Sequence, residues 1–231
     1  MITINYEYKL KPNAQQIEIF EAWLDACKKV YNFALRERKD WVNSRKSTVN
    51  SCSLVSEYII PADAPRPTYA SQCKALTSAK KVYPELQLPH IHVLQQTLRQ
   101  LESAFVAMWE RSSGFPRFKN KMRSFVYPDI KQSAVESGRV KLPKIGWVKM
   151  KMSRPLPEGF ILKQIRVVKK ASGYFAMLTY QLSVQVANVP VHGHFLGVDI
   201  GLDKYLATSD GELVSRPRFF RALHRELKLL V

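Results

Sequence analysis

The chain has 231 residues, of which 46% are hydrophobic and 24% charged, so it is long enough for one large or two smaller domains and too apolar to be disordered. It has no predominantly apolar run of 18 residues and no basic segment followed by an apolar core at its start, so neither a membrane-spanning helix nor a secretory signal is expected. Its 36 Lys+Arg against 19 Asp+Glu give a net charge of +17, which favours nucleic acid as a partner over an anionic membrane or no specific partner.

The N-terminal residues predict a strand followed by a helix. Residues 2–10 alternate apolar and polar side chains with period 2, which is typical of a strand, and Pro12 ends the pattern. Asn13 and Gln16 are spaced as in a capping box, so a helix begins there. Its apolar stripe at 3.6-residue spacing predicts that the helix continues to about Trp41.

Two further helices are expected before the middle of the chain. Residues 43–67 are rich in Ser, Asn, Ala and Pro and predict a loop or short helical fragments. Thr68 is placed to cap a second helix that Pro84 closes, and Pro89 opens a third with a strong apolar stripe. The helical region ends at Gly114. We interpret the apolar stripes of all three helices as core packing.

A series of strands follows, separated by Gly, Pro and Ser turns. Such a pattern predicts a small β-barrel, which the isolated first strand is expected to complete. The strand-like runs are 125–127, 139–142, 147–152, 161–169 and 174–186.

The C-terminal residues predict the start of a second domain. Residues 188–194 are typical of a linker, and 195–199 have the pattern of a buried strand. A second strand is expected over 204–209, with a hairpin turn at Asp210 and Gly211. Pro217 starts a helix whose apolar stripe continues to the last residues.

The basic residues are concentrated in the middle of the chain. Residues 1–110 carry 14 basic and 11 acidic groups (+3), residues 111–170 carry 16 and 3 (+13), and residues 171–231 carry 6 and 5 (+1). A solvated surface without a partner would mix its signs, so this block predicts contact with a polyanion.

Within that block, cations and aromatic residues alternate. The cations Arg117, Lys119, Lys121 and Arg123 would lie on one side of an extended backbone, where they match the phosphates of a nucleic-acid strand. Phe115, Phe118 and Phe125 would be available to stack on bases. The alternative is a solvated edge strand whose charges prevent aggregation.

Asp199 is a candidate metal ligand. It lies in Gly197-Val198-Asp199-Ile200-Gly201, and a carboxylate on a strand flanked by glycines can hold Mg²⁺, as in two-metal nucleases. The motif is weak by itself, and one carboxylate cannot hold two divalent ions. Asp203, Asp210 and Glu212 are expected to have turn and surface roles.

Histidine and cysteine patterns do not predict a metal site. His90-x-His92 and His192-x-His194 each lack a nearby third ligand. Cys27, Cys52 and Cys73 are odd in number and never form a C-x-x-C pair, which excludes a disulfide framework and a four-cysteine zinc site and favours a reducing cytoplasm.

Several motifs, in order, resemble the TnpB (OrfB) proteins of bacterial insertion sequences, which are relatives of compact type V CRISPR effectors. The similar stretches are Lys9-Leu10-Lys11-Pro12 with Val30-Tyr31-Asn32, the G-x-P-R-F-K-x-K element at 114–121, the K-L-P-K-I-G-W-V run at 141–148, the first RuvC-type motif at 197–202, and Arg216-Pro217-Arg218-Phe219.

The resemblance implies an α+β fold with three parts. These are a split, oligonucleotide-binding-type β-barrel formed by residues 1–12 and 114–190, an inserted helical recognition lobe at 13–113, and the first hairpin and helix of an RNase H-like (RuvC) nuclease domain at 191–231. It also implies an activity, RNA-guided DNA cleavage with Mg²⁺, and therefore guide RNA and DNA as partners.

The resemblance and the charge pattern together give the candidate site. Asp199 would be the first catalytic, metal-binding carboxylate. The expected nucleic-acid-binding residues are Arg117, Phe118, Lys119, Lys121, Arg123, Lys141, Lys144, Lys149 and Lys151.

The family's later catalytic carboxylates and its four-cysteine zinc element have no counterpart in this sequence. We therefore expect a C-terminally truncated TnpB-like protein that binds nucleic acid but does not cleave it alone. The alternatives are an RNA-independent DNA-binding repressor and a decayed transposase remnant that does not fold by itself.

Overall fold

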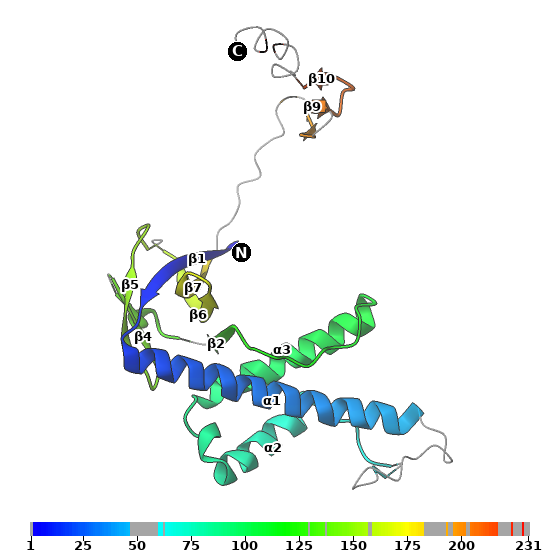
Figure 1. The fold of residues 1–231 in the computed structure, drawn as a ribbon, viewed down its shortest axis with the longest axis vertical. Coiled ribbons are helices and arrows are strands. Elements are labelled where there is room, and N and C mark those ends of the chain that lie inside the picture. Colours follow the sequence, from blue (N-terminus) through cyan, green and yellow to red (C-terminus); the bar gives the residue numbers. More distant parts are fainter. Residues whose placement is uncertain are drawn as a thin grey trace. The chain divides into compact units, whose positions relative to one another are not determined.

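The structure is a computed structural model, and it describes residues 2–46, 60–61, 63–128, 130–136, 138–156, 159–182, 193, 196–201, 204–216, 223 and 228. The chain divides into two compact units, 1–185 and 186–231. The first unit combines three long helices with a curled antiparallel sheet (Figure 1), which confirms the expected α+β class. Among the described residues, no helix has the length and apolar character needed to cross a membrane.

The three helices are α1 (Ala14–Lys46), α2 (Tyr69–Val82) and α3 (Ile91–Glu110), and single 3-10 turns lie at Pro84–Leu86 and Gln132–Ala134. The first cap is confirmed, because the Asn13 side chain accepts from the Gln16 amide at 2.8 Å and the Gln16 side chain accepts from the Asn13 amide at 3.1 Å. Thr68 caps α2 as expected, in a capping box with Ser71. In both cases a side chain satisfies an amide that the first helical turn leaves unpaired.

The helix α1 is longer than its apolar stripe predicts, since it ends at Lys46 and not near Trp41. The loop that follows supports the extra turns. The Trp41 indole donates to the Ala64 carbonyl at 3.0 Å, and the Arg45 guanidinium donates to the carbonyls of Pro61 and Ala64 at 2.9 Å. The two basic residues of the last turn also complement the negative end of the helix dipole.

Seven strands form the sheet in the order β2-β6-β7-β1-β5-β4-β3, and every pair is antiparallel. The first strand therefore lies inside the sheet, between strands that follow the helices in sequence. The strand bounds are β1 Ile2–Lys11, β2 Ser124–Pro128, β3 Val135–Glu136, β4 Arg139–Leu142, β5 Gly146–Lys151, β6 Ile161–Lys170 and β7 Gly173–Leu182.

Aromatic side chains join the sheet to α1. Phe20 and Trp23 of α1 pack against Phe125 of β2 with ring centroids 5.8 and 5.6 Å apart. The Tyr127 hydroxyl of β2 donates to the Pro143 carbonyl at 3.0 Å, so the sheet curls far enough for β2 to reach the turn between β4 and β5. The sheet thus lies over the N-terminal part of α1, as Figure 1 shows.

A buried arginine joins the three helices. Arg38 of α1 is only 3% exposed and donates from Nε to Gln72 of α2 at 3.0 Å. Its guanidinium also pairs with Glu102 of α3 at 2.5 Å and lies over the Phe105 ring at 5.1 Å. A charge this deeply buried requires such partners, so it restricts how the helices pack.

The second unit contains the three-stranded sheet β10-β9-β8, built from β8 Val198–Asp199, β9 Lys204–Thr208 and β10 Leu213–Ser215. Gly211 adopts φ 90° in the predicted turn between β9 and β10. The expectation of a buried strand over 195–199 is wrong for the described residues 196–199, since Val198 is 52% exposed. Strands of two, five and three residues are too short to bury an apolar face.

Candidate nucleic-acid interface

The basic tract, residues 115–123, follows the surface of α1 after α3 ends, and the structure assigns no strand to it. At its start Phe115 packs on Phe105 of α3 with ring centroids 5.4 Å apart. At its end the Arg123 carbonyl accepts from the Lys169 amide of β6 at 2.7 Å. The tract therefore connects the helices to the sheet with both ends fixed.

The middle of the tract is held by one side chain of α1. Asn32 donates to the Lys119 carbonyl at 2.9 Å and accepts from the Lys119 amide at 2.8 Å, so its carboxamide pairs with both backbone groups of one residue, as a neighbouring strand would. The Lys119 ammonium lies over the Tyr31 ring at 5.5 Å, and Lys39 lies over Phe118 at 5.6 Å. All four predicted cations of the tract are exposed.

The aromatic residues of this region divide into two groups. Phe115 and Phe118 are 39% and 45% exposed, so their rings are accessible for stacking on bases beside the exposed cations of the tract. The expectation that Phe125 stacks on bases is wrong, because its ring is 2% exposed and belongs to the core against α1.

A second basic surface lies on the outer face of the sheet. Residues directly opposite one another in an antiparallel pair point to the same side. The register places Lys9 opposite Lys151, and it places Lys149 between Lys11 and Arg139. Their sequence neighbours, such as Leu10, Val140, Val148 and Met150, point to the other side and are buried.

Trp147 lies among these cations. It is opposite Lys141 in the register, and the Arg139 guanidinium and the Lys141 ammonium lie 4.7 and 5.8 Å from its ring centroid. Glu136 pairs with Arg139 at 2.7 Å. We call this surface the basic sheet face; its cations are Lys9, Lys11, Arg139, Lys141, Lys149 and Lys151, and all six are exposed.

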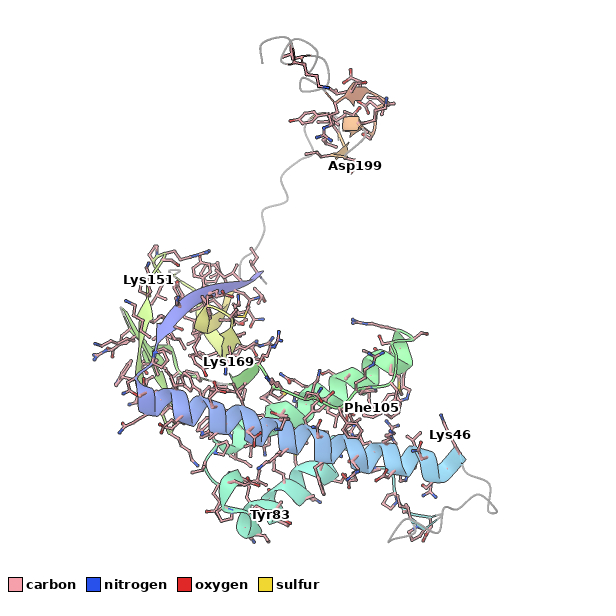
Figure 2. The ribbon with its side chains drawn as sticks, viewed as in Figure 1. Lys46, Tyr83, Phe105, Lys151, Lys169 and Asp199 are labelled. Carbon is pink, nitrogen blue, oxygen red and sulfur yellow. The ribbon has the colours of Figure 1, made fainter. Side chains whose placement is uncertain are left out.

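The basic sheet face contains three of the predicted residues, Lys141, Lys149 and Lys151, and three that sequence reasoning missed. Lys9 and Lys11 alternate with buried residues in the same way as Lys149 and Lys151, and this was the signal that could have identified them. Arg139 begins the strand next to them. Figure 2 labels Lys151 at this part of the sheet and Lys169 closer to α1.

Lys144 has a different environment from the other predicted residues. Its ammonium donates to the Gln87 carbonyl at 2.7 Å and lies 3.4 Å from the carbonyls of Leu88 and Pro89. It adopts φ 65° in the turn between β4 and β5. Lys144 therefore joins the sheet to the segment before α3, and its ammonium is less available to a phosphate than those of the basic sheet face.

The histidine pair at the start of α3 has a structural role. The imidazole of His90 accepts from the His92 amide at 3.4 Å and caps the helix. Burial, followed by the charges of His92, Lys144 and Lys80, lowers the pKa of His90 below 6.5. The second pair, His192 and His194, lies outside the described residues.

Asp199 is exposed on β8, opposite Ala207 of β9. Its two flanking glycines are close to neighbouring groups. A side chain at Gly201 would lie 3.2 Å from the Lys204 carbonyl, and the Gly197 carbonyl accepts from the Ser209 amide at 2.8 Å. A side chain at position 201 would require a neighbouring backbone group to shift, which favours glycine there.

The described residues do not form a complete Mg²⁺ site. Among them, no group of three or more His, Cys, Asp or Glu residues could hold a metal ion. Asp199 supplies the hard carboxylate oxygens that Mg²⁺ prefers, but the described residues do not complete a group of three ligands around it, and two ions require further carboxylates. Asp203 lies outside the described residues.

The family HTH_OrfB_IS605, described as a helix-turn-helix domain, matches residues 1–47. Over the described part of that segment the structure has one strand, β1, and one continuous helix, α1. The match therefore coincides with the strand at the centre of the sheet and the helix that holds the basic tract.

Two curated proteins are similar over nearly the whole chain. A protein of Escherichia coli (strain K12) named "Putative RNA-guided DNA endonuclease InsQ" is 24% identical over 229 residues, which cover 97% of this chain and 52% of that protein. A protein of Streptomyces pristinaespiralis named "Putative RNA-guided DNA endonuclease" is 26% identical over 223 residues, which cover 94% of this chain and 50% of that protein. The chain spans about half the length of these relatives. Together these matches confirm that the chain resembles the TnpB (OrfB) proteins of insertion sequences.

Proposed function

We propose that this chain binds guide RNA and target DNA through the basic sheet face and the basic tract, as part of an RNA-guided DNA endonuclease system of the TnpB type. The names of its two relatives support this assignment. We further propose the domain division given by the resemblance, with residues 1–12 and 114–190 as the barrel, 13–113 as a recognition lobe and 191–231 as the start of a RuvC-like nuclease domain.

The observation that carries the proposal is the pairing of like charges across three adjacent strands. Cations directly opposite one another on a sheet destabilise it, so a protein without a polyanionic partner would be expected to avoid them. Here Lys9 faces Lys151, and Lys149 faces both Lys11 and Arg139. Phosphates spaced along a nucleic-acid strand would neutralise this repulsion, and Trp147 offers a ring for stacking.

The chemistry proposed for the second unit rests on Asp199. Mg²⁺ bound there would stabilise the charge that develops on a phosphodiester during hydrolysis. Because no group of three or more possible metal ligands forms among the described residues, we propose that the 231-residue chain binds nucleic acid without cleaving DNA by itself.

The test compares binding and cleavage by the same protein. We expect the purified chain, freed of bound nucleic acid, to bind single-stranded RNA, and to lose most of that affinity when Lys9, Lys149 and Lys151 are replaced together by Gln. The matched control replaces three exposed cations elsewhere, Lys74, Lys81 and Lys163, by Gln, and it should retain more affinity.

Three results would contradict the proposal. Equal loss of RNA affinity in both triple variants would show that total charge, and not the basic sheet face, determines binding. Mg²⁺-dependent DNA cleavage by the isolated chain would show that it contains a complete catalytic centre. Tight duplex DNA binding that persists after ribonuclease treatment, without RNA affinity, would instead favour the repressor.

A further inference from the structure

A cleft of about 580 Å³ lies beside the basic tract, between α1 and the turn that joins β6 to β7. Its volume is in the range of small-molecule sites. Five cations and two carboxylates line it, a local excess of three positive charges. The charged lining residues are Glu21, Asp25, Lys28, Lys121, Arg123, Lys169 and Lys170.

Three of the five cations already have carboxylate partners. Lys28 pairs with Asp25, Lys169 pairs with Glu21 at 2.5 Å, and Lys170 pairs with Glu7 at 2.7 Å. The Lys169 ammonium and the Tyr174 hydroxyl both donate to Glu21 and lower the pKa of its carboxyl group, so Glu21 is ionised at neutral pH. These three cations are therefore already partly neutralised.

The other two cations, Lys121 and Arg123, have no carboxylate partner among the residues that the structure describes. They lie two positions apart in a segment whose backbone is fixed at Lys119 by Asn32 and at Arg123 by β6. An ammonium and a guanidinium held in this way form a ready binding site for a phosphate group.

The rest of the lining indicates what carries the phosphate. Leu24 and Met122 give the cleft an apolar part, and the carboxylate oxygens of Glu21 and Asp25 can accept hydrogen bonds from hydroxyl or amino groups. A sugar and base attached to the phosphate would meet both kinds of surface.

We propose that this cleft binds a nucleotide through a phosphate monoester, held by Lys121 and Arg123. A monoester carries about two negative charges at neutral pH, whereas a bridging diester carries one, so the unpaired cations favour the monoester. The source is either the 5′ end of a nucleic-acid strand or a free mononucleotide. For the strand end, this inference rests on the proposed nucleic-acid binding.

The experiment measures the affinity of the whole chain for one short single-stranded RNA with either a 5′-phosphate or a 5′-hydroxyl end. We expect the phosphorylated strand to bind about tenfold more tightly, because its end adds charge-assisted hydrogen bonds. Lys121→Ala with Arg123→Ala should abolish this ratio, whereas Lys74→Ala, an exposed lysine on α2, should leave it unchanged. This ratio of affinities distinguishes binding in the cleft from the general effect of the protein's positive charge on RNA binding.

Competition by AMP, with adenosine as the control, identifies the source of the monoester. If AMP lowers the affinity of the phosphorylated strand to that of the hydroxyl strand and no further, the cleft accepts free nucleotides as well as strand ends. If AMP changes the affinity of neither strand while the phosphorylated strand binds more tightly, the cleft is specific for strand ends. Equal affinity for the two strands, together with no binding of AMP, would overturn the inference and leave the proposed function standing. Absence of binding to both strands, with AMP bound through Lys121 and Arg123, would contradict the proposed function alone.

Discussion

Neutralising one lysine of the basic sheet face should stabilise the protein and weaken its binding to nucleic acid. The replacement Lys149→Thr introduces a residue that favours strands and removes a charge that faces both Lys11 and Arg139. Lys151→Thr removes a charge that faces Lys9 only. Lys149→Thr therefore removes two like-charge pairs, whereas Lys151→Thr removes one.

The size of the effect follows from the number of pairs. A directly opposed like-charge pair destabilises a sheet by about 0.2–1 kcal/mol. Because Glu136 partly neutralises Arg139, we expect Lys149→Thr to raise the free energy of unfolding by somewhat less than twice the gain from Lys151→Thr. For a chain of this length, about 1 kcal/mol corresponds to a rise in Tm of about 2–4 °C.

The assay is thermal unfolding without nucleic acid at low salt, repeated at about 1 M salt, where screening should remove most of the gain. Lys163→Thr is the matched control, since Lys163 is an exposed lysine of β6 at the register shift and has no directly opposed cation. If both sheet-face variants lower Tm at low salt, or if they bind RNA as tightly as the original chain, the reasoning from cross-strand repulsion is refuted.

Three further predictions concern the helices and the tract. Asn32→Asp should lower the free energy of unfolding by about 1 kcal/mol and weaken RNA binding, because a carboxylate would face the Lys119 carbonyl. Urea unfolding, with Asn32→Ala as the comparison, measures this loss of stability, and an unchanged midpoint would contradict the prediction. Glu102→Ala should lower the free energy of unfolding by about 3–5 kcal/mol, and by more than Arg38→Met, because it leaves the buried guanidinium without its carboxylate. Urea unfolding compares the two variants, and an equal or larger loss in Arg38→Met would contradict the prediction. The folded-state pKa of His90 is lowered, so the unfolded chain binds a proton first and Tm should fall as pH decreases below about 6.5. His90→Asn keeps the cap and removes the titratable group, so it should reduce this dependence of Tm on pH. An identical pH profile in the variant would show that protonation of His90 does not cause the fall.

In the first unit, helix starts could be predicted from the sequence because residues close to them in the chain determine where the helix begins. Asn13 with Gln16 and Thr68 with Ser71 mark helix starts because their side chains cap the chain immediately beside them. The end of α1 was not predictable in this way, since bonds from Trp41 to a later loop support its last turns.

The candidate site was only partly predictable because it depends on register. Lys141, Lys149 and Lys151 were expected from the charge of their own segment, whereas Lys9 joins them only through pairing between strands about 140 residues apart. Phe125 was misassigned because its sequence neighbours are basic, and only the tertiary packing shows that its ring faces α1.

The dependence of RNA affinity on salt tests the central claim most directly. Each phosphate contact to a single strand contributes about −0.7 to the slope of log K against log salt concentration. If all six cations of the basic sheet face engage phosphates, the 231-residue chain should give a slope of about −4 or steeper, and Lys149→Thr should make it shallower by about 0.7. A slope near zero would contradict the account, because it would mean that this surface does not bind a polyanion.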